Sequence, residues 1–172
     1  MKRLLFGLLF ISLSSCITIR KAPKITTHKI STAKKFQRKF PKEKAFIFED
    51  PKNADEFYHF INTKFKLNDI DVGFDVPITI NNKTYYFTYY EAEIPDKKFN
   101  LLGLAVDATL KVKGMDPLFD EGYVKRNGHW YIAITVYDEE NKNCLKSKYP
   151  NRKAILDYLR LLHNEYLHSP TY

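Results

Sequence analysis

VPITINNKTYYFTYYEAEI, residues 76–94, decides the fold class, because this stretch predicts two strands joined by a turn. Apolar residues alternate with others over residues 76–80, as they do in a strand that buries one face. Residues 81–83 are turn formers, and the Tyr- and Phe-rich run at 84–94 is typical of a second strand. We therefore expect antiparallel strands at the centre of the chain.

Strand signals continue on both sides of this centre. Residues 45–49 form a short apolar run that predicts a strand or a packing segment, and residues 104–112 alternate as a half-buried strand does. Residues 123–137 predict a β-hairpin that turns at Asn127-Gly128, because Asn-Gly is a strong hairpin signal. One face of its second strand carries Trp130, Ile132, Ile134 and Val136.

Two helices flank the strands. Asp50 followed by Pro51 predicts a helix over residues 51–66, because an acidic N-cap accepts backbone N–H groups and proline fits the first position. Its apolar residues recur at helical spacing: Ala54, Phe57, Ile61 and Phe65. A second helix opens at Pro150. Its apolar face carries Ile155, Leu159, Leu162 and Tyr166.

This order of elements predicts an α+β fold, an antiparallel sheet of four to five strands with an N-terminal and a C-terminal helix packed on it. We place this single domain at residues 45–172. The segment RNGHWYIAI at 126–134, together with the leading helix, resembles NTF2-like domains. That resemblance implies a ligand pocket between sheet and helices. The order departs from that family, whose members open with several helices and close on strands.

The N-terminus follows a different pattern. Two basic residues precede a mostly apolar run at 4–13, and two small residues then lead to Cys16, which is the layout of a secretory signal. The apolar run has about half of the roughly 20 residues that a membrane span needs. LSSC at 13–16 resembles the lipobox of bacterial lipoproteins. The resemblance implies that residues 1–15 are a signal peptide, cleaved between Ser15 and Cys16, and that Cys16 carries diacylglycerol and an acyl chain such as palmitate.

The resemblance also bears on location. Ile17 stands where lipoproteins kept at the inner membrane carry Asp, so the resemblance implies the outer membrane. No acidic run follows Cys16, which favours the periplasmic face. The expected partner of the acylated Cys16 is membrane lipid.

Residues 16–44 predict a lipidated basic tether. Residues 20–44 contain ten Lys and Arg and one acid, a net charge of +9, whereas residues 45–172 contain 16 basic and 19 acidic residues, a net charge of −3. Nucleic-acid-binding proteins carry their basic stripe on the folded surface, so this distribution argues against nucleic acid. The tether either contacts anionic headgroups, at about 1 kcal/mol per basic residue, or is an extended, solvated linker. Within it Ala33, Phe36 and Phe40 would share one face of a short interfacial helix.

Candidate chemical groups are few. Residues 69–75, DIDVGFD, alternate acids as a calcium loop does, but they lack the EF-hand spacing, so we predict a solvated turn. Cys144 has no disulfide partner once Cys16 is lipidated, and no thiol-enzyme signature flanks it. No pair of histidines has a metal-ligand spacing; they are His28, His59, His129, His163 and His168. We therefore predict no catalytic residue, metal or cofactor.

The tyrosines are the most distinctive feature of the strands. They lie on both faces of residues 84–94, and one of those faces must be core. The other is a candidate binding surface, because exposed tyrosine favours recognition sites. Its candidate residues are Tyr86, Tyr90, Tyr131 and Tyr137. The alternative is that a helix covers each face.

Together these features predict a membrane-anchored, non-catalytic module that binds a protein or polymer of the cell envelope. Two other functions stay open. One is a small-ligand-binding or enzymatic NTF2-like domain. The other is a toxin-immunity lipoprotein, since many of those are small, single-domain and anchored in the envelope.

Overall fold

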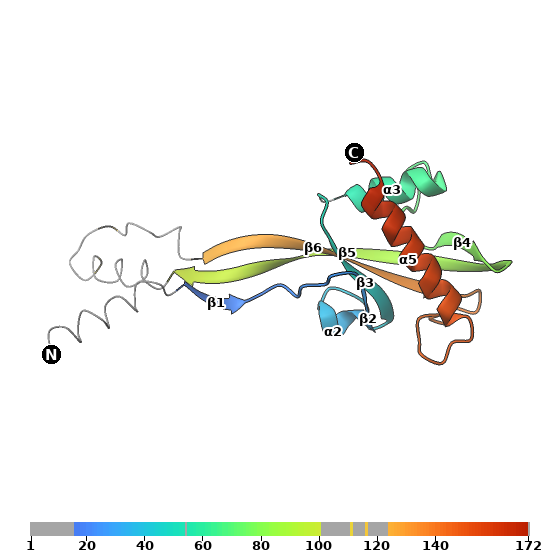
Figure 1. Ribbon diagram of the computed structural model, residues 1–172, viewed down its shortest axis with the longest axis horizontal. Helices are drawn as coiled ribbons and strands as arrows, with labels where there is room; N and C mark the ends of the chain where they lie inside the picture. The colour runs from blue at the N-terminus through green and yellow to red at the C-terminus, as the bar shows by residue number, and fades with distance from the viewer. Residues whose placement is uncertain (1–15, 54, 101–110, 112–115, 117–123, 172) are drawn as a thin grey trace. The chain divides into compact units, whose positions relative to one another are not determined.

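The computed structural model describes residues 16–53, 55–100, 111, 116 and 124–171, and it confirms the predicted α+β class (Figure 1). The strands of the described residues form one sheet in the order β1-β5-β6-β3-β2, and β4 pairs with β5 beside this path. The strands are β1 (Cys16–Arg20), β2 (Lys29–Thr32), β3 (Lys44–Asp50), β4 (Val76–Ile80), β5 (Lys83–Asn100) and β6 (Val124–Tyr137). The helices are α2 (Ala33–Phe36), α3 (Glu56–Phe65) and α5 (Arg152–His168).

The chain divides into two compact units, where we expected a single domain. β5 and β6 contribute residues to both units. The first unit comprises the described residues of Met1–Pro23 and Ile94–His129. In it β1 pairs antiparallel with the end of β5, with Cys16 opposite Asn100. Asp96 accepts the Ala22 N–H at 2.5 Å and lies 3.8 Å from His129 Nε2.

The second unit, Lys24–Glu93 and Trp130–Tyr172, contains the hydrophobic core. β3 pairs with β6 so that Phe46 lies opposite Ile134 and Phe48 opposite Ile132. Because side chains alternate along a strand, these residues share one face. α3 and α5 lie on that same side of the sheet (Figure 1). They contribute the buried residues Phe57, Phe60, Ile61, Ile155, Leu156, Leu159, Leu162 and Tyr166.

The opposite face of this sheet is covered by the chain that precedes β3. β2 pairs with β3, and α2 follows β2 directly. The Ala33 N–H at the start of α2 donates to Glu43 O, just before β3, at 2.9 Å. Ala33 is 0% exposed and Phe40 is 3% exposed. The folded part therefore begins before our predicted boundary at residue 45. Residues 29–40 are not a solvated linker, because Ala33 and Phe40 are buried and Ile30 and Phe36 are partly buried.

Both predicted helices exist, but each begins later than predicted. α3 begins at Glu56 because Asp50 closes β3 instead of capping a helix: its carboxylate accepts the Lys52 N–H at 2.9 Å and the Tyr166 hydroxyl at 2.8 Å. α5 begins at Arg152 and buries its predicted face. Among the described residues, no helix combines the length and apolarity that a membrane crossing requires.

The predicted hairpin at Asn127-Gly128 is wrong, because β6 runs without a turn from Val124 to Tyr137. Turn propensity is a local preference, and pairing with the 18-residue β5 overrides it here. The turn predicted at residues 81–83 does form, with Asn81 and Asn82 at positive φ of 52° and 59°. The strand predicted at 104–112 lies outside the described residues, apart from Lys111, which is helical.

We expect Phe40→Ala to lower the free energy of unfolding of the full chain by about 3 kcal/mol, since it empties a buried site against the sheet. Urea unfolding followed by circular dichroism measures this loss. Lys39→Ala, at an exposed neighbouring position, should change stability by less than about 0.5 kcal/mol. Equal, small effects of both substitutions would show that residues 29–40 do not belong to the fold.

Candidate functional site

The four predicted surface tyrosines do not form an exposed patch. Tyr131 is 0% exposed, because Phe36 packs edge-on against its ring with the centroids 5.1 Å apart. Tyr90 is half-buried, and its ring centroid lies 6.4 Å from that of Phe40. Tyr86 and Tyr137 are also half-buried. The segment that we expected to be a tether is thus what covers Tyr90 and Tyr131.

The cysteine and two of the histidines considered as candidate chemical groups are packed within the fold: Cys144, His28 and His163. Burial raises the pKa of the Cys144 thiol to about 11, so the thiol stays protonated near neutral pH. His28 stacks on Phe46 at 4.5 Å, and His163 packs against Phe48 at 4.2 Å. Burial, and then the charge of nearby His28, lower the pKa of His163 to about 4. Both histidines therefore behave as aromatic packing groups at neutral pH.

The acidic segment at residues 69–75 is a turn, as predicted. Asp69, Asp71 and Asp75 have positive φ of 61°, 49° and 49°, and all three are exposed. Asp69 accepts hydrogen bonds from the Asn62 amide and the Tyr58 hydroxyl, which tie the turn to α3. Within the described part of the chain, His, Cys, Asp and Glu form no group of three or more that could hold a metal ion.

A groove lies at one end of the sheet, within the second unit. It comprises two adjoining cavities of about 370 and 590 Å³, within the range of about 300–1,000 Å³ that is usual for small-ligand sites. Residues 82–85, at the start of β5, line one side, and residues 138–151, in the loop between β6 and α5, line the other. We call this feature the end groove. Antiparallel neighbours place the start of β5 beside the end of β6, which brings these distant segments together.

The loop at residues 138–151 is held in one conformation by its own hydrogen bonds. Cys144 N–H bonds to Val136 O at 2.8 Å, and Asn143, which is 2% exposed, donates to Lys44 O at 2.9 Å. Leu145 is 1% exposed, and the Arg152 guanidinium donates to its carbonyl at 3.1 Å. One wall of the end groove is therefore preorganised, which reduces the entropy lost when a ligand binds.

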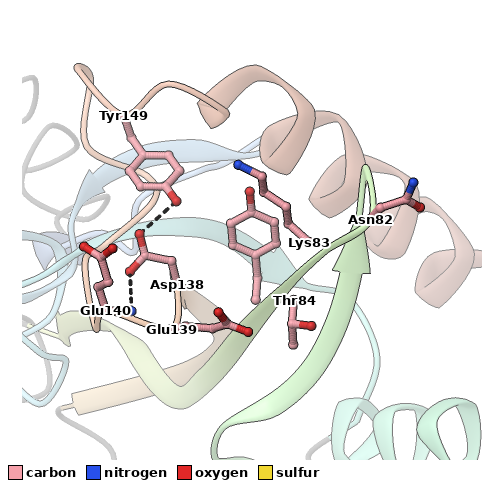
Figure 2. Close-up of a pocket in the computed structure, with 8 residues that line it drawn as sticks. Asn82, Lys83, Thr84, Asp138, Glu139, Glu140 and Tyr149 are labelled. Atoms are coloured by element: carbon pink, nitrogen blue, oxygen red, sulfur yellow. Dashed lines mark hydrogen bonds between the residues drawn. The ribbon is translucent and has the colours of Figure 1, made fainter.

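Asp138 is the central acceptor of this loop. Its carboxylate accepts N–H groups from Glu140 at 3.1 Å and Lys142 at 2.8 Å, and the Tyr149 hydroxyl at 2.9 Å; Figure 2 shows Tyr149 pointing its hydroxyl at Asp138. Burial opposes ionisation of Asp138, but these hydrogen bonds outweigh it and lower its pKa. Burial, followed by contacts with Cys144 and Asp138, raises the pKa of Tyr149. Asp138 is thus an ionised structural acceptor, and Tyr149 is a neutral donor.

The lysines of the end groove are less engaged than its acids. Glu140 pairs with Lys142, and Asp138 is occupied by three hydrogen bonds. Lys83, Lys146 and Lys148 also line the larger cavity; all three are exposed, and none forms an ion pair with a described residue. The end groove therefore offers ammonium groups to a ligand.

The sequence analysis did not predict that residues 82–85 and residues 138–151 lie together in one groove. It identified the turn at residues 81–83, but it did not single out the polar, Lys-rich residues 141–148 as part of a site. The signal that could have joined them is topological, because both segments flank neighbouring antiparallel strands at one end of the sheet. The sequence analysis predicted a turn at Asn127-Gly128 and therefore did not identify β6 as one strand that pairs with β5.

A second group of titratable side chains lies in the core and lines neither cavity. Asp50 is 5% exposed and Glu56 is 4% exposed. Glu91 is half-buried, and its Oε1 accepts no hydrogen bond from a described residue. Burial, and then the charges of Asp50 and Asp55, raise the pKa of Glu91 to about 7. Glu91 therefore carries a proton in mildly acidic solution.

The chain matches no protein-family model, and no curated protein and no solved structure is significantly similar to it. The site is accordingly argued from its own geometry and charges.

Glu91 should make stability depend on pH. Its folded pKa of about 7 exceeds the ordinary value of 4.5, so the folded state binds more protons between these values, and stability falls as pH rises through that window. After allowance for partial exposure, we expect Glu91→Gln to remove about 1–2 kcal/mol of the stability difference between about pH 5 and about pH 8. Urea unfolding at both pH values measures it.

Glu93→Gln is the matched control for this experiment, because Glu93 is exposed and lies two residues further along β5. It should leave the pH dependence as in the wild type. If Glu91→Gln also left it unchanged, the carboxyl of Glu91 would ionise normally in the fold.

Proposed function

We propose that this chain is a lipid-anchored, non-catalytic binding module of the bacterial cell envelope. The anchor is a lipid on Cys16, which the resemblance of residues 13–16 to a lipobox supports. The folded part binds an envelope partner. The observation that carries this binding function is the end groove, a concave site with one preorganised wall and three exposed ammonium groups that pair with no acid among the described residues.

The burial of the predicted surface tyrosines favours a binding site elsewhere on the second unit. Phe36 and Phe40 contact the rings of Tyr131 and Tyr90, and a partner would have to displace buried apolar surface to reach Tyr131. Displacing a buried aromatic side chain costs several kcal/mol. The end groove is open without any rearrangement, because its lysines are already exposed. We therefore assign recognition to the end groove.

The chemistry of the end groove favours binding over catalysis. Its most buried acid, Asp138, is ionised and already accepts three hydrogen bonds, and Tyr149 donates to it. The nearby Cys144 thiol is protonated at neutral pH and bonds to Lys142 O at 3.3 Å. These groups hold the loop in shape. The groups left to meet a ligand are flexible ammonium ions and exposed carboxylates, which bind and orient charged or polar groups.

Lipid attachment is tested by metabolic labelling with radioactive palmitate. We expect the wild-type chain to take up the label and to sediment with membranes, and Cys16→Ser to lose both properties, because two or more acyl chains are needed for stable anchoring. Cys144→Ser is the matched control, since it removes the other cysteine of the chain and should retain label and membrane association. Equal labelling of Cys16→Ser and wild type would refute the anchor.

Partner binding is tested in intact cells with a diazirine amino acid, which forms a covalent adduct with whatever it touches. Placed at Glu139, an exposed residue that lines the end groove, it should give a discrete adduct on an immunoblot of the envelope. Placed at Lys39, which is exposed next to the covered tyrosines, it should give none. Adducts of equal yield at both positions, or at neither, would count against a binding function of the end groove.

A further inference from the structure

We infer that the ligand of the end groove is a phosphorylated saccharide. The inference rests on the proposed function only in taking the end groove as the binding site. It adds the chemical class of the ligand, and it assigns the two adjoining cavities to two parts of that ligand. The larger cavity receives the phosphate, and the smaller cavity receives sugar hydroxyl groups.

The larger cavity has the charge that a phosphate requires. Lys83 approaches it from the start of β5, whereas Lys146 and Lys148 approach it from the loop. Lysine binds phosphate as a point charge. Both acids of this cavity are occupied, since Glu140 pairs with Lys142 and Asp138 accepts three hydrogen bonds. Four lysines against two acids leave the lining of this cavity with a net charge of +2.

This positive lining contrasts with the rest of the folded chain. Residues 45–172 carry 16 basic and 19 acidic residues, so the ammonium groups of the end groove are not part of a generally basic surface. An anion drawn to this part of the chain therefore meets favourable potential at the groove, not everywhere. The local excess of positive charge is what selects an anionic ligand.

The smaller cavity has the groups that bind hydroxyls. Its lining includes the Asn82 amide, the Thr84 hydroxyl and the exposed Glu139 carboxylate, together with Asp138 and Glu140, which it shares with the larger cavity. Amides and hydroxyls both donate and accept hydrogen bonds, and a carboxylate accepts them. These are the complements of sugar hydroxyl groups, and the carboxylate disfavours a second phosphate there. Lys83 lines both cavities, as do Asp138, Glu140 and Tyr149, and of these four residues it is the cation that could meet a phosphate joined to a sugar.

The size of the site agrees with this assignment. The larger cavity, of about 590 Å³, accommodates a ligand of a few tens of atoms. A concave site of this kind fits the tip of a saccharide chain or a single phosphosugar better than it fits a flat bilayer surface. A phospholipid headgroup shares the phosphate chemistry but offers fewer hydroxyls to the smaller cavity. The two sources are separable by experiment.

The test is calorimetric titration of the full chain with three probes: inorganic phosphate, glucose 6-phosphate and glucose. We expect glucose 6-phosphate to bind most tightly, inorganic phosphate more weakly and glucose least, because the phosphate meets the lysines and the sugar adds hydrogen bonds. Vesicles of phosphatidylglycerol, with phosphatidylcholine vesicles as their control, form a fourth arm for the lipid source.

Two triple variants make the test specific. The groove variant replaces the three free lysines of the end groove: Lys83→Gln, Lys146→Gln and Lys148→Gln. The control variant removes the same charge from exposed positions around α2: Lys34→Gln, Lys35→Gln and Lys39→Gln. We expect the groove variant to bind glucose 6-phosphate about tenfold to a hundredfold more weakly than wild type, and the control variant to stay within about twofold.

Each outcome decides the inference. The order of affinities above, lost only in the groove variant, supports it. Equal loss in both variants would show general charge attraction and overturn it. Vesicle binding that depends on the groove lysines, without glucose 6-phosphate binding, would replace the saccharide by a lipid headgroup. If no phosphate probe bound but Glu139 still gave its specific adduct, the inference would fail while the proposed function stood.

Discussion

The central constraint on this fold is that residues 131–136 of β6 are buried on both faces. Tyr131, Ile132, Ala133, Ile134, Thr135 and Val136 are six consecutive residues with no exposed surface. A strand of this kind needs cover on each side, because every uncovered apolar side chain would forfeit about 1.5–3 kcal/mol. α3 and α5 cover one face, and residues 29–40 cover the other. The N-terminal segment is therefore as much a part of the core as the C-terminal helix.

Strand pairing also limits the length of any spacer that follows Cys16. If a lipid on Cys16 holds the chain at a membrane, little free spacer remains, because β1 begins at Cys16 and pairs with β5, and β2 pairs with β3. The end groove lies where β5 begins and β6 ends. In the proposed function, partner recognition therefore rests on this end of the sheet and not on a flexible tether.

Charge is arranged differently in the core and in the end groove. In the core, the carboxylate of Asp50 accepts the Tyr166 hydroxyl, and burial raises the pKa of both Asp50 and Glu91. Proton uptake there avoids the large cost of an unpaired buried charge. In the end groove, Asp138 is ionised, and local hydrogen bonds consume its acceptor capacity. Burial thus favours protonated acids in the core, whereas hydrogen bonds favour an ionised Asp138 in the end groove.

The sequence alone determined the local elements of this protein, and tertiary structure decided how they combine. Alternation predicted β4, turn-forming residues predicted the turn at Asn81 and Asn82, and helical spacing predicted the apolar face of α5. Each of these signals depends only on residues a few positions apart. Three features depend on partners far along the chain. β6 pairs with β5 and continues as a strand through Asn127-Gly128. Asp50 accepts the Tyr166 hydroxyl in the core instead of capping a helix. Phe36 and Phe40 pack on Tyr131 and Tyr90 and cover the second face of the sheet. The end groove could not be predicted either, because no sequence pattern relates residues 82–85 to residues 138–151. Only the pairing of β5 with β6 brings these two segments together.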